Sequence, residues 1–76
     1  MDTRLHSELY LSVIIPVFNE KDRINKSLKE ITDYLNARSY SWEIIIVDDG
    51  STDGTSDLVR EFGLDANRIT LLQQSH

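Results

Sequence analysis

The chain has 76 residues, a net charge of −5 and no cysteine. This length allows one small core, and the absence of cysteine excludes disulfides and thiolate zinc sites. The negative charge argues against a general nucleic-acid surface, which needs clustered Lys and Arg. With 39% hydrophobic and 28% charged residues, the composition is that of an ordinary globular domain. It includes no apolar run near the roughly 18–20 residues that a membrane-spanning helix needs.

The first strand is predicted at residues 11–17, where apolar side chains fall on both alternating faces. Pro16 lacks an N–H, so it marks the strand's end or a position without a ladder hydrogen bond. The preceding residues, 1–10, show no clear period. We expect a leader or a short helix there, with His6 as a solvated surface residue.

An amphipathic helix is predicted next. Residues 19–22 supply turn and cap chemistry, and the apolar residues that follow recur at spacings of four, three and four. These residues are Ile24, Leu28, Ile31 and Leu35. At 100° per residue they fall within an arc of about 60°, as the buried stripe of a helix should. Residues 36–41 lack this period and are interpreted as a connection.

The most informative stretch is EIIIVDDGSTDGT, at residues 43–55. Four consecutive apolar, β-branched residues predict a second strand buried on both faces. We interpret the adjacent Trp42 as a packing residue. The acids, hydroxyls and glycines that follow predict a tight polar loop. In open parallel sheets, such loops beyond the carboxyl ends of the strands form the ligand-binding crevice.

A second helix and a third strand complete the pattern. Residues 57–62 carry apolar side chains on one side, and Thr52 or Asp53 can cap the start of this helix. Gly63 occupies the position expected of a C-cap glycine. Residues 69–72 are a short third strand, and we interpret the terminal histidine as incidental.

The order β-α-β-α-β, with right-handed crossovers, predicts a parallel sheet of strand order 3-2-1. We therefore expect an α/β fold with three layers, which is half of a doubly wound nucleotide-binding fold. In this order the first strand lies at an edge, although its apolar pattern suits a central position. An apolar edge with unpaired backbone groups is a template for pairing, so we expect the chain to self-associate or to need a partner.

The adjacent carboxylates Asp48 and Asp49 have three interpretations. They accept backbone N–H bonds before a helix, where negative charge is favourable. Alternatively, one binds the N–H of a nucleobase or the hydroxyls of a ribose while the other orients the loop. A metal is the third option, but consecutive side chains diverge along an extended backbone and no further ligand cluster is present. Phosphate-binding glycine motifs and the residue orders of nucleophilic triads are absent.

Two motifs together resemble the N-terminal part of family 2 glycosyltransferases, enzymes of the GT-A fold that use nucleotide sugars. The motifs are LSVIIPVFNE at residues 11–20 and EIIIVDDGSTDGT at residues 43–55. Between them, RINKSL (23–28) and ITDYL (31–35) look most like dolichyl- or polyprenyl-phosphate glucosyltransferases. The resemblance covers roughly residues 11–72 and implies a truncated, Rossmann-like GT-A fold.

The resemblance also implies a nucleotide site. In the family, the proline, aromatic residue and glutamate of the first motif line the nucleotide pocket, and the acidic pair contacts the base, commonly uracil. The matching residues are Pro16, Phe18, Glu20, Asp48 and Asp49. Asp49 is our first choice for the base contact. A carboxylate that faces a base N–H, with a ring or proline packed on the base, suits the selection of uracil or guanine.

The resemblance implies that residues 11–76 are the nucleotide-binding part of an incomplete hexosyltransferase domain. The donor would be a UDP- or GDP-sugar, with UDP-glucose favoured, and the acceptor a polyprenyl or dolichyl phosphate. The full-length enzyme would use Mg²⁺ or Mn²⁺. The family's Asp-x-Asp metal motif is absent here, so we expect no metal ligand, no catalytic residue and no transfer by this chain alone. We expect the enzyme in the cytoplasm, including the cytoplasmic face of a membrane.

Two other classes of protein were considered. One is a small, non-catalytic nucleotide-binding or regulatory α/β module that is complete as it stands. The other is a receiver-like signalling domain. The receiver is disfavoured because its acidic pair would follow a different strand and no later strand supplies a phosphorylatable Asp. A reading frame that continues into an Asp-x-Asp motif would favour the enzyme over the module.

Overall fold

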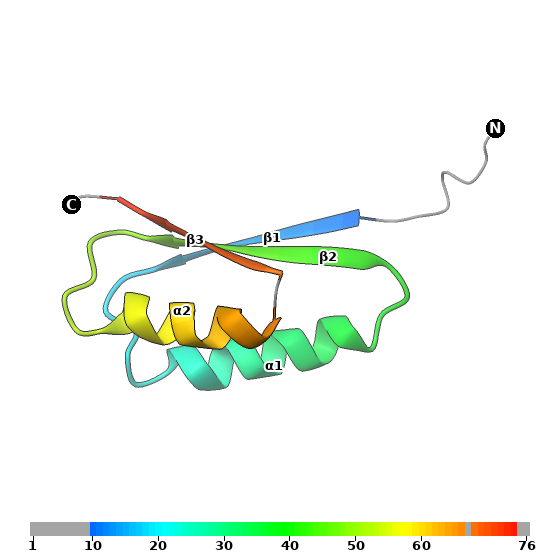
Figure 1. Ribbon diagram of the computed structural model, residues 1–76, viewed down its shortest axis with the longest axis horizontal. Helices are drawn as coiled ribbons and strands as arrows, with labels where there is room; N and C mark the ends of the chain where they lie inside the picture. Colours follow the sequence, from blue (N-terminus) through cyan, green and yellow to red (C-terminus); the bar gives the residue numbers. More distant parts are fainter. Residues whose placement is uncertain (1–9, 67, 75–76) are drawn as a thin grey trace.

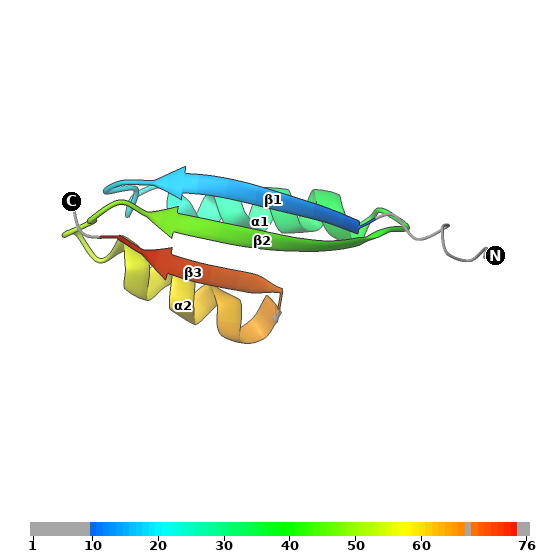
Figure 2. The same ribbon diagram turned by 90° about the horizontal axis from the view of Figure 1, so that it is seen from above.

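The computed structural model describes residues 10–66 and 68–74. The elements in chain order are β1 (Tyr10–Val17), α1 (Ile24–Asn36), β2 (Ser41–Asp48), α2 (Thr55–Ala66) and β3 (Ile69–Gln73). The strands form one parallel sheet with β2 between β1 and β3. Both helices lie on the same face of this sheet (Figure 1 and Figure 2). The α/β class, the parallel sheet and the predicted strand order, with β1 at an edge, are confirmed.

Among the residues that the structure describes, only one face of the sheet is covered. Side chains alternate along a strand, so Ile44 and Ile46 of β2 are fully buried under the helices while Ile45 between them is only partly buried. On β1, Ile14 is 64% exposed. Within the described residues, the expectation that the strands are buried on both faces is therefore wrong. These residues form two layers, the sheet and one layer of helices, where three layers were expected. Both crossovers run the same way across the sheet, so their right-handedness puts both helices on one side.

The core lies between the helices and the covered face. Its buried residues are Val17, Ile24, Leu28, Leu35, Trp42, Ile44, Ile46 and Val59. The apolar stripe predicted for α1 is confirmed, because three of its four members belong to this core and Ile31 packs against it. Burying one such aliphatic side chain contributes about 1.5–3 kcal/mol, so this stripe is what holds α1 to the sheet. Trp42 is 4% exposed, which confirms its packing role.

The predicted cap of α1 is wrong. No side chain in the described part of the chain caps this helix. Instead the carbonyl of Glu20 accepts hydrogen bonds from the N–H groups of Arg23 and Ile24, at 2.9 and 2.8 Å. The side chain of Asn19, one of the expected cap residues, bonds to a different loop, as described below. Because its oxygen already accepts this hydrogen bond, the Asn19 side chain does not cap α1.

The predicted end of α2 is also wrong, since Gly63 lies inside the helix and not at its C-cap. One glycine weakens a helix by roughly 1 kcal/mol relative to alanine but does not break it. At this point α2 faces the start of β3, where an added Cβ would lie 3.7 Å from the Cβ of Ile69. The glycine therefore marks the approach of helix to strand.

The leader or helix expected at residues 1–10 lies outside the described residues, except that Tyr10 begins β1. His76 lies outside them too. No helix in the described part of the chain is long and apolar enough to cross a membrane.

Candidate functional site

Two loops leave the sheet at the same edge, because β1 and β2 are parallel. Residues 18–23 follow β1 and residues 49–54 follow β2. The two loops lie side by side at the end of the sheet opposite the start of β1 (Figure 1 and Figure 2). Open parallel sheets bind ligands at this edge, so the predicted crevice would lie here, and ligand binding itself stays a prediction.

Asn19 joins the first loop to the second. Its backbone N–H donates to Ser51 Oγ at 2.8 Å, and its side-chain Oδ1 accepts from the N–H of Thr52 at 2.9 Å. Its φ of 50° lies in the left-handed region, which asparagine tolerates better than most residues. The short amide therefore allows a tight turn after β1 and bonds directly to the other loop.

Two more hydrogen bonds complete the connection. The N–H of Glu20 donates to Thr55 Oγ1 at 2.9 Å, and that of Lys21 donates to Asp53 Oδ2 at 3.1 Å. Asp53 also accepts from the N–H of Thr55 at 3.0 Å, which supports the start of α2 as expected. The hydroxyl of Thr55 is the main reason that the pKa of Asp53 is lowered; partial burial acts in the opposite direction.

Asp48 is the buried member of the acidic pair, at 1% exposed. Its Oδ1 accepts from the N–H of Ser51 at 2.9 Å, and its Oδ2 accepts from the hydroxyl of Ser56. Burial raises the pKa of this carboxyl, but the hydrogen bonds from Ser56 and Ser51 together outweigh burial, so the net pKa lies below its ordinary value. Asp48 therefore holds the loop and the first turn of α2.

Asp49 is the exposed member of the pair. Its backbone N–H donates to the carbonyl of Val17 at 3.0 Å, which ties it to the end of β1. The residue after Val17 is Phe18, which is 46% exposed. Since Val17 is the register partner of Asp48, Phe18 and Asp49 follow neighbouring strand ends.

The other two predicted site residues lie at the same edge. Pro16 pairs in register with Val47 near the end of β1, where it is exposed. Glu20 is partly buried, and its carboxylate forms an ion pair with Arg23. The structure thus brings all five predicted residues to one end of the sheet, while their contacts with a nucleotide stay a prediction.

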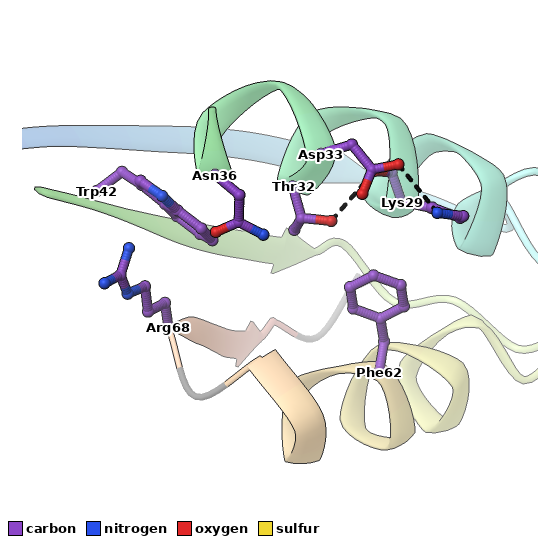
Figure 3. Close-up of a pocket in the computed structure, with 7 residues that line it drawn as sticks. All are labelled: Lys29, Thr32, Asp33, Asn36, Trp42, Phe62 and Arg68. Atoms are coloured by element: carbon purple, nitrogen blue, oxygen red, sulfur yellow. Dashed lines mark hydrogen bonds and ion pairs between the residues drawn. The ribbon is translucent and has the colours of Figure 1, made fainter. Parts of the chain in front are cut away.

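A small hollow of about 230 Å³ lies beside the second loop. It is lined by Ser51, Thr52, Gly54, Ser56, Asp57, Arg60 and Gln73. A larger groove of about 560 Å³ lies between α1 and α2 (Figure 3), and its lining includes Trp42 and Arg68. The Arg68 guanidinium stacks 4.8 Å from the centre of the Trp42 ring. This groove is formed by the two helices, the amino end of β2 and Arg68 just before β3, away from the two loops.

The described residues form no metal site. Among residues 10–66 and 68–74, no group of three or more His, Asp or Glu side chains is arranged to hold an ion. Both carboxylate oxygens of Asp48 already accept hydrogen bonds. These residues do not fit the divalent cation that the resemblance implies for the full-length enzyme, so we derive no step through a metal.

Sequence reasoning missed the residues that join and support the loops, which are Asn19, Ser51, Thr55, Ser56 and Gln73. A signal was present, because hydroxyl side chains recur in the second loop while the first begins with asparagine. That composition predicted turns but did not indicate which groups would bond across the two loops.

The sequence profile of glycosyl transferase family 2 matches residues 12–76. The chain therefore belongs to this family, and the predicted resemblance is confirmed. It is 40% identical over 74 residues to a Trichomonas vaginalis protein named dolichyl-phosphate beta-glucosyltransferase ALG5D, a match that covers 91% of this chain and 23% of the relative.

Two further relatives agree with this assignment. A Saccharomyces cerevisiae dolichyl-phosphate beta-glucosyltransferase is 50% identical over 50 residues, which are 64% of this chain and 15% of the relative. An Edwardsiella ictaluri undecaprenyl-phosphate 4-deoxy-4-formamido-L-arabinose transferase is 38% identical over 52 residues, or 68% and 16%. The chain thus spans less than a quarter of the length of these relatives.

Proposed function

We propose that this chain is the donor-nucleotide-binding part of a glycosyltransferase. The enzyme transfers a hexose from a UDP- or GDP-sugar, with UDP-glucose as first choice, to a polyprenyl or dolichyl phosphate. The observation that carries the proposal is the joined pair of loops, which places Asp49 and Phe18 at neighbouring strand ends in a chain of this family. The names of the relatives, which refer to dolichyl and undecaprenyl phosphate, support the class of acceptor.

We propose different roles for the two carboxylates of the acidic pair. Asp49 is exposed, and its carboxylate accepts a hydrogen bond from an N–H of uracil or guanine. The exposed ring of Phe18 and the exposed Pro16 supply apolar surface for the base. Asp48 holds the loop in place, because both its oxygens are used within the chain. Glu20 lies at the same edge of the sheet and contributes to the nucleotide site through the first loop, residues 18–23.

In the proposed reaction an oxygen of the acceptor phosphate attacks the anomeric carbon, and the nucleoside diphosphate leaves. Mg²⁺ or Mn²⁺ stays a proposal for the full-length enzyme, and its ligands would have to come from residues other than those that the structure describes. The described residues contribute binding and orientation of the nucleotide, and the remaining chemistry is assigned to the rest of the enzyme.

The test is the affinity for UDP, measured by calorimetry on the longest reading frame that contains this chain. Asp49→Asn is expected to weaken binding by about 1.5–3 kcal/mol, because a hydrogen bond to a charged acceptor is lost. The matched control is Asp33→Asn, since Asp33 lies in an exposed ion pair with Lys29 on α1. It should leave affinity unchanged. Equal affinities for the wild type and Asp49→Asn would contradict the base-reading role.

A second measurement concerns activity. The 76-residue chain alone is expected to transfer no glucose from UDP-glucose to dolichyl phosphate, because its sequence has no Asp-x-Asp motif. The longest reading frame should transfer glucose in the same assay. If it binds UDP but transfers no sugar to any lipid phosphate, the non-catalytic nucleotide-binding module becomes the better interpretation.

A further inference from the structure

A chain of hydrogen bonds lies behind the acidic pair and joins three elements. The hydroxyl of Ser56, in the first turn of α2, donates to Asp48 Oδ2. Gln73, at the end of β3, donates from Nε2 to Ser56 Oγ at 3.2 Å and accepts from Arg60 Nη2. Arg60 in turn bonds to Asp57 Oδ1 at 3.0 Å. The buried carboxylate of β2 is thereby connected through β3 to the surface of α2.

The backbone at Asp48 and Asp49 is also fixed from both sides. The carbonyl of Asp48 accepts from the N–H of Gln74, beyond β3, at 2.9 Å. The N–H of Asp49 donates to the carbonyl of Val17 on β1 at 3.0 Å. The chain direction at Asp49 is thus set by both neighbouring strands together with the side chain of Asp48.

We propose that Ser56, supported by Gln73, is a positioning residue of the nucleotide site. Its hydroxyl holds the Asp48 carboxylate, and Asp48 fixes the start of the loop from which Asp49 faces the ligand. Ser56 acts through Asp48 and does not touch the nucleotide. This inference rests on the proposed function and adds to it the residues that hold the base-reading carboxylate in place.

The electrostatics explain why a hydroxyl is needed at this point. Asp48 is almost fully buried, which by itself raises its pKa, and Asp53 raises it further; the bonds from Ser56 and Ser51 lower it. The register partners of Asp48 on β1 and β3 are the uncharged Val17 and Gln73.

The charged groups that α2 brings nearby act only indirectly. Arg60 reaches Asp48 through Gln73 and Ser56, and Asp57 is paired with Arg60. Without the Ser56 hydroxyl, burial of Asp48 would be less well compensated and its pKa would rise.

The test compares Ser56→Ala with Ser56→Thr, which keeps the hydroxyl, in the longest reading frame. Ser56→Ala is expected to weaken UDP binding about tenfold and to move the acid limb of its pH profile to higher pH. Ser56→Thr should restore both. The control Ser39→Ala removes a hydroxyl in the exposed loop between α1 and β2 and should change neither. Wild-type affinity and pH profile in Ser56→Ala would overturn the proposal.

A second measurement needs no nucleotide and therefore separates this inference from the proposed function. The Asp48 carboxyl carbon and the Asp49 amide are followed by NMR during a pH titration of the longest reading frame that contains this chain. Ser56→Ala should raise the titration midpoint of Asp48 and shift the Asp49 amide. Gln73→Ala, which leaves the hydroxyl in place, should cause smaller changes in the same directions and serves if Ser56→Ala does not fold. Unchanged signals would overturn the positioning role, whereas a wild type that binds no UDP would defeat only the proposed function.

Discussion

The two faces of the sheet carry similar aliphatic residues but have different environments. Under the helices, Ile44 and Ile46 are 0% exposed. On the open face, Ile14 is 64% exposed and Leu72 is 51% exposed. The comparison shows that a strand with apolar residues on both faces is suited to burial on both faces. The handedness of the crossovers decides which of the two faces the helices of this chain cover. The predictions below test how differently the two faces respond to substitution.

The largest effect is expected on the covered face. Ile46→Ala should lower the free energy of unfolding by about 2–5 kcal/mol, because it removes buried methyl groups and leaves a cavity. The control is the same substitution at the adjacent Ile45, which is only partly buried and points to the open face. It should cost less than half as much in urea denaturation. Equal losses would contradict the one-sided burial; if Ile46→Ala does not fold, Ile46→Val should still cost about 0.5–1.5 kcal/mol.

A smaller effect is expected for Asp48, the polar residue at the end of the covered face. Asp48→Ala leaves the Ser51 N–H and the Ser56 hydroxyl without their acceptor, at a cost of about 1–3 kcal/mol near pH 7. The folded pKa of Asp48 lies below its ordinary value, so its contribution is fully present above the unfolded pKa of about 3.9 and is lost as the pH falls through the folded pKa. The difference between the wild type and Asp48→Ala should therefore shrink on acidification, as measured by denaturation at neutral and acidic pH. A difference independent of pH would contradict this assignment.

The smallest effect on stability is expected on the open face. The wild-type chain should self-associate at micromolar concentration, through the exposed edge of β1 and the apolar open face. Ile14→Lys should weaken this association in sedimentation and change the stability of the fold by only about 0.5 kcal/mol. Tyr34→Lys, on the exposed side of α1, is the control and should leave association unchanged. A wild-type chain that sediments as a stable monomer would show that the open face needs no partner.

Features encoded by local patterns could be predicted from the sequence. The spacing of Ile24, Leu28 and Leu35 identified α1, and the two apolar runs identified β1 and β2. The acidic pair was correctly placed at the end of β2, because strand ends are marked by a sharp change from apolar to polar residues. These signals each lie within a few neighbouring residues.

The missed features depend on residues that are distant in sequence. Asn19 is one of the residues 19–22 for which the sequence predicts turn and cap chemistry, but its side chain bonds to Thr52, 33 positions away. Ser56 and Gln73 meet only because β2 and β3 pair in a particular register. The sequence predicts Gly63 at the end of α2, because composition alone does not separate a C-cap glycine from one that faces a strand. Long-range pairing decides all of these roles.

The hydrogen bonds between the two loops have a thermodynamic consequence. Each joins residues at least 32 positions apart, so the site exists only after β1 and β2 have paired. A ligand that binds this site but not the unfolded chain must stabilise the fold by mass action, by about 2.7 kcal/mol at a free concentration one hundred times its Kd. The melting temperature should therefore rise with nucleotide concentration, and the size of that rise would report the affinity of the loops without any assay of sugar transfer.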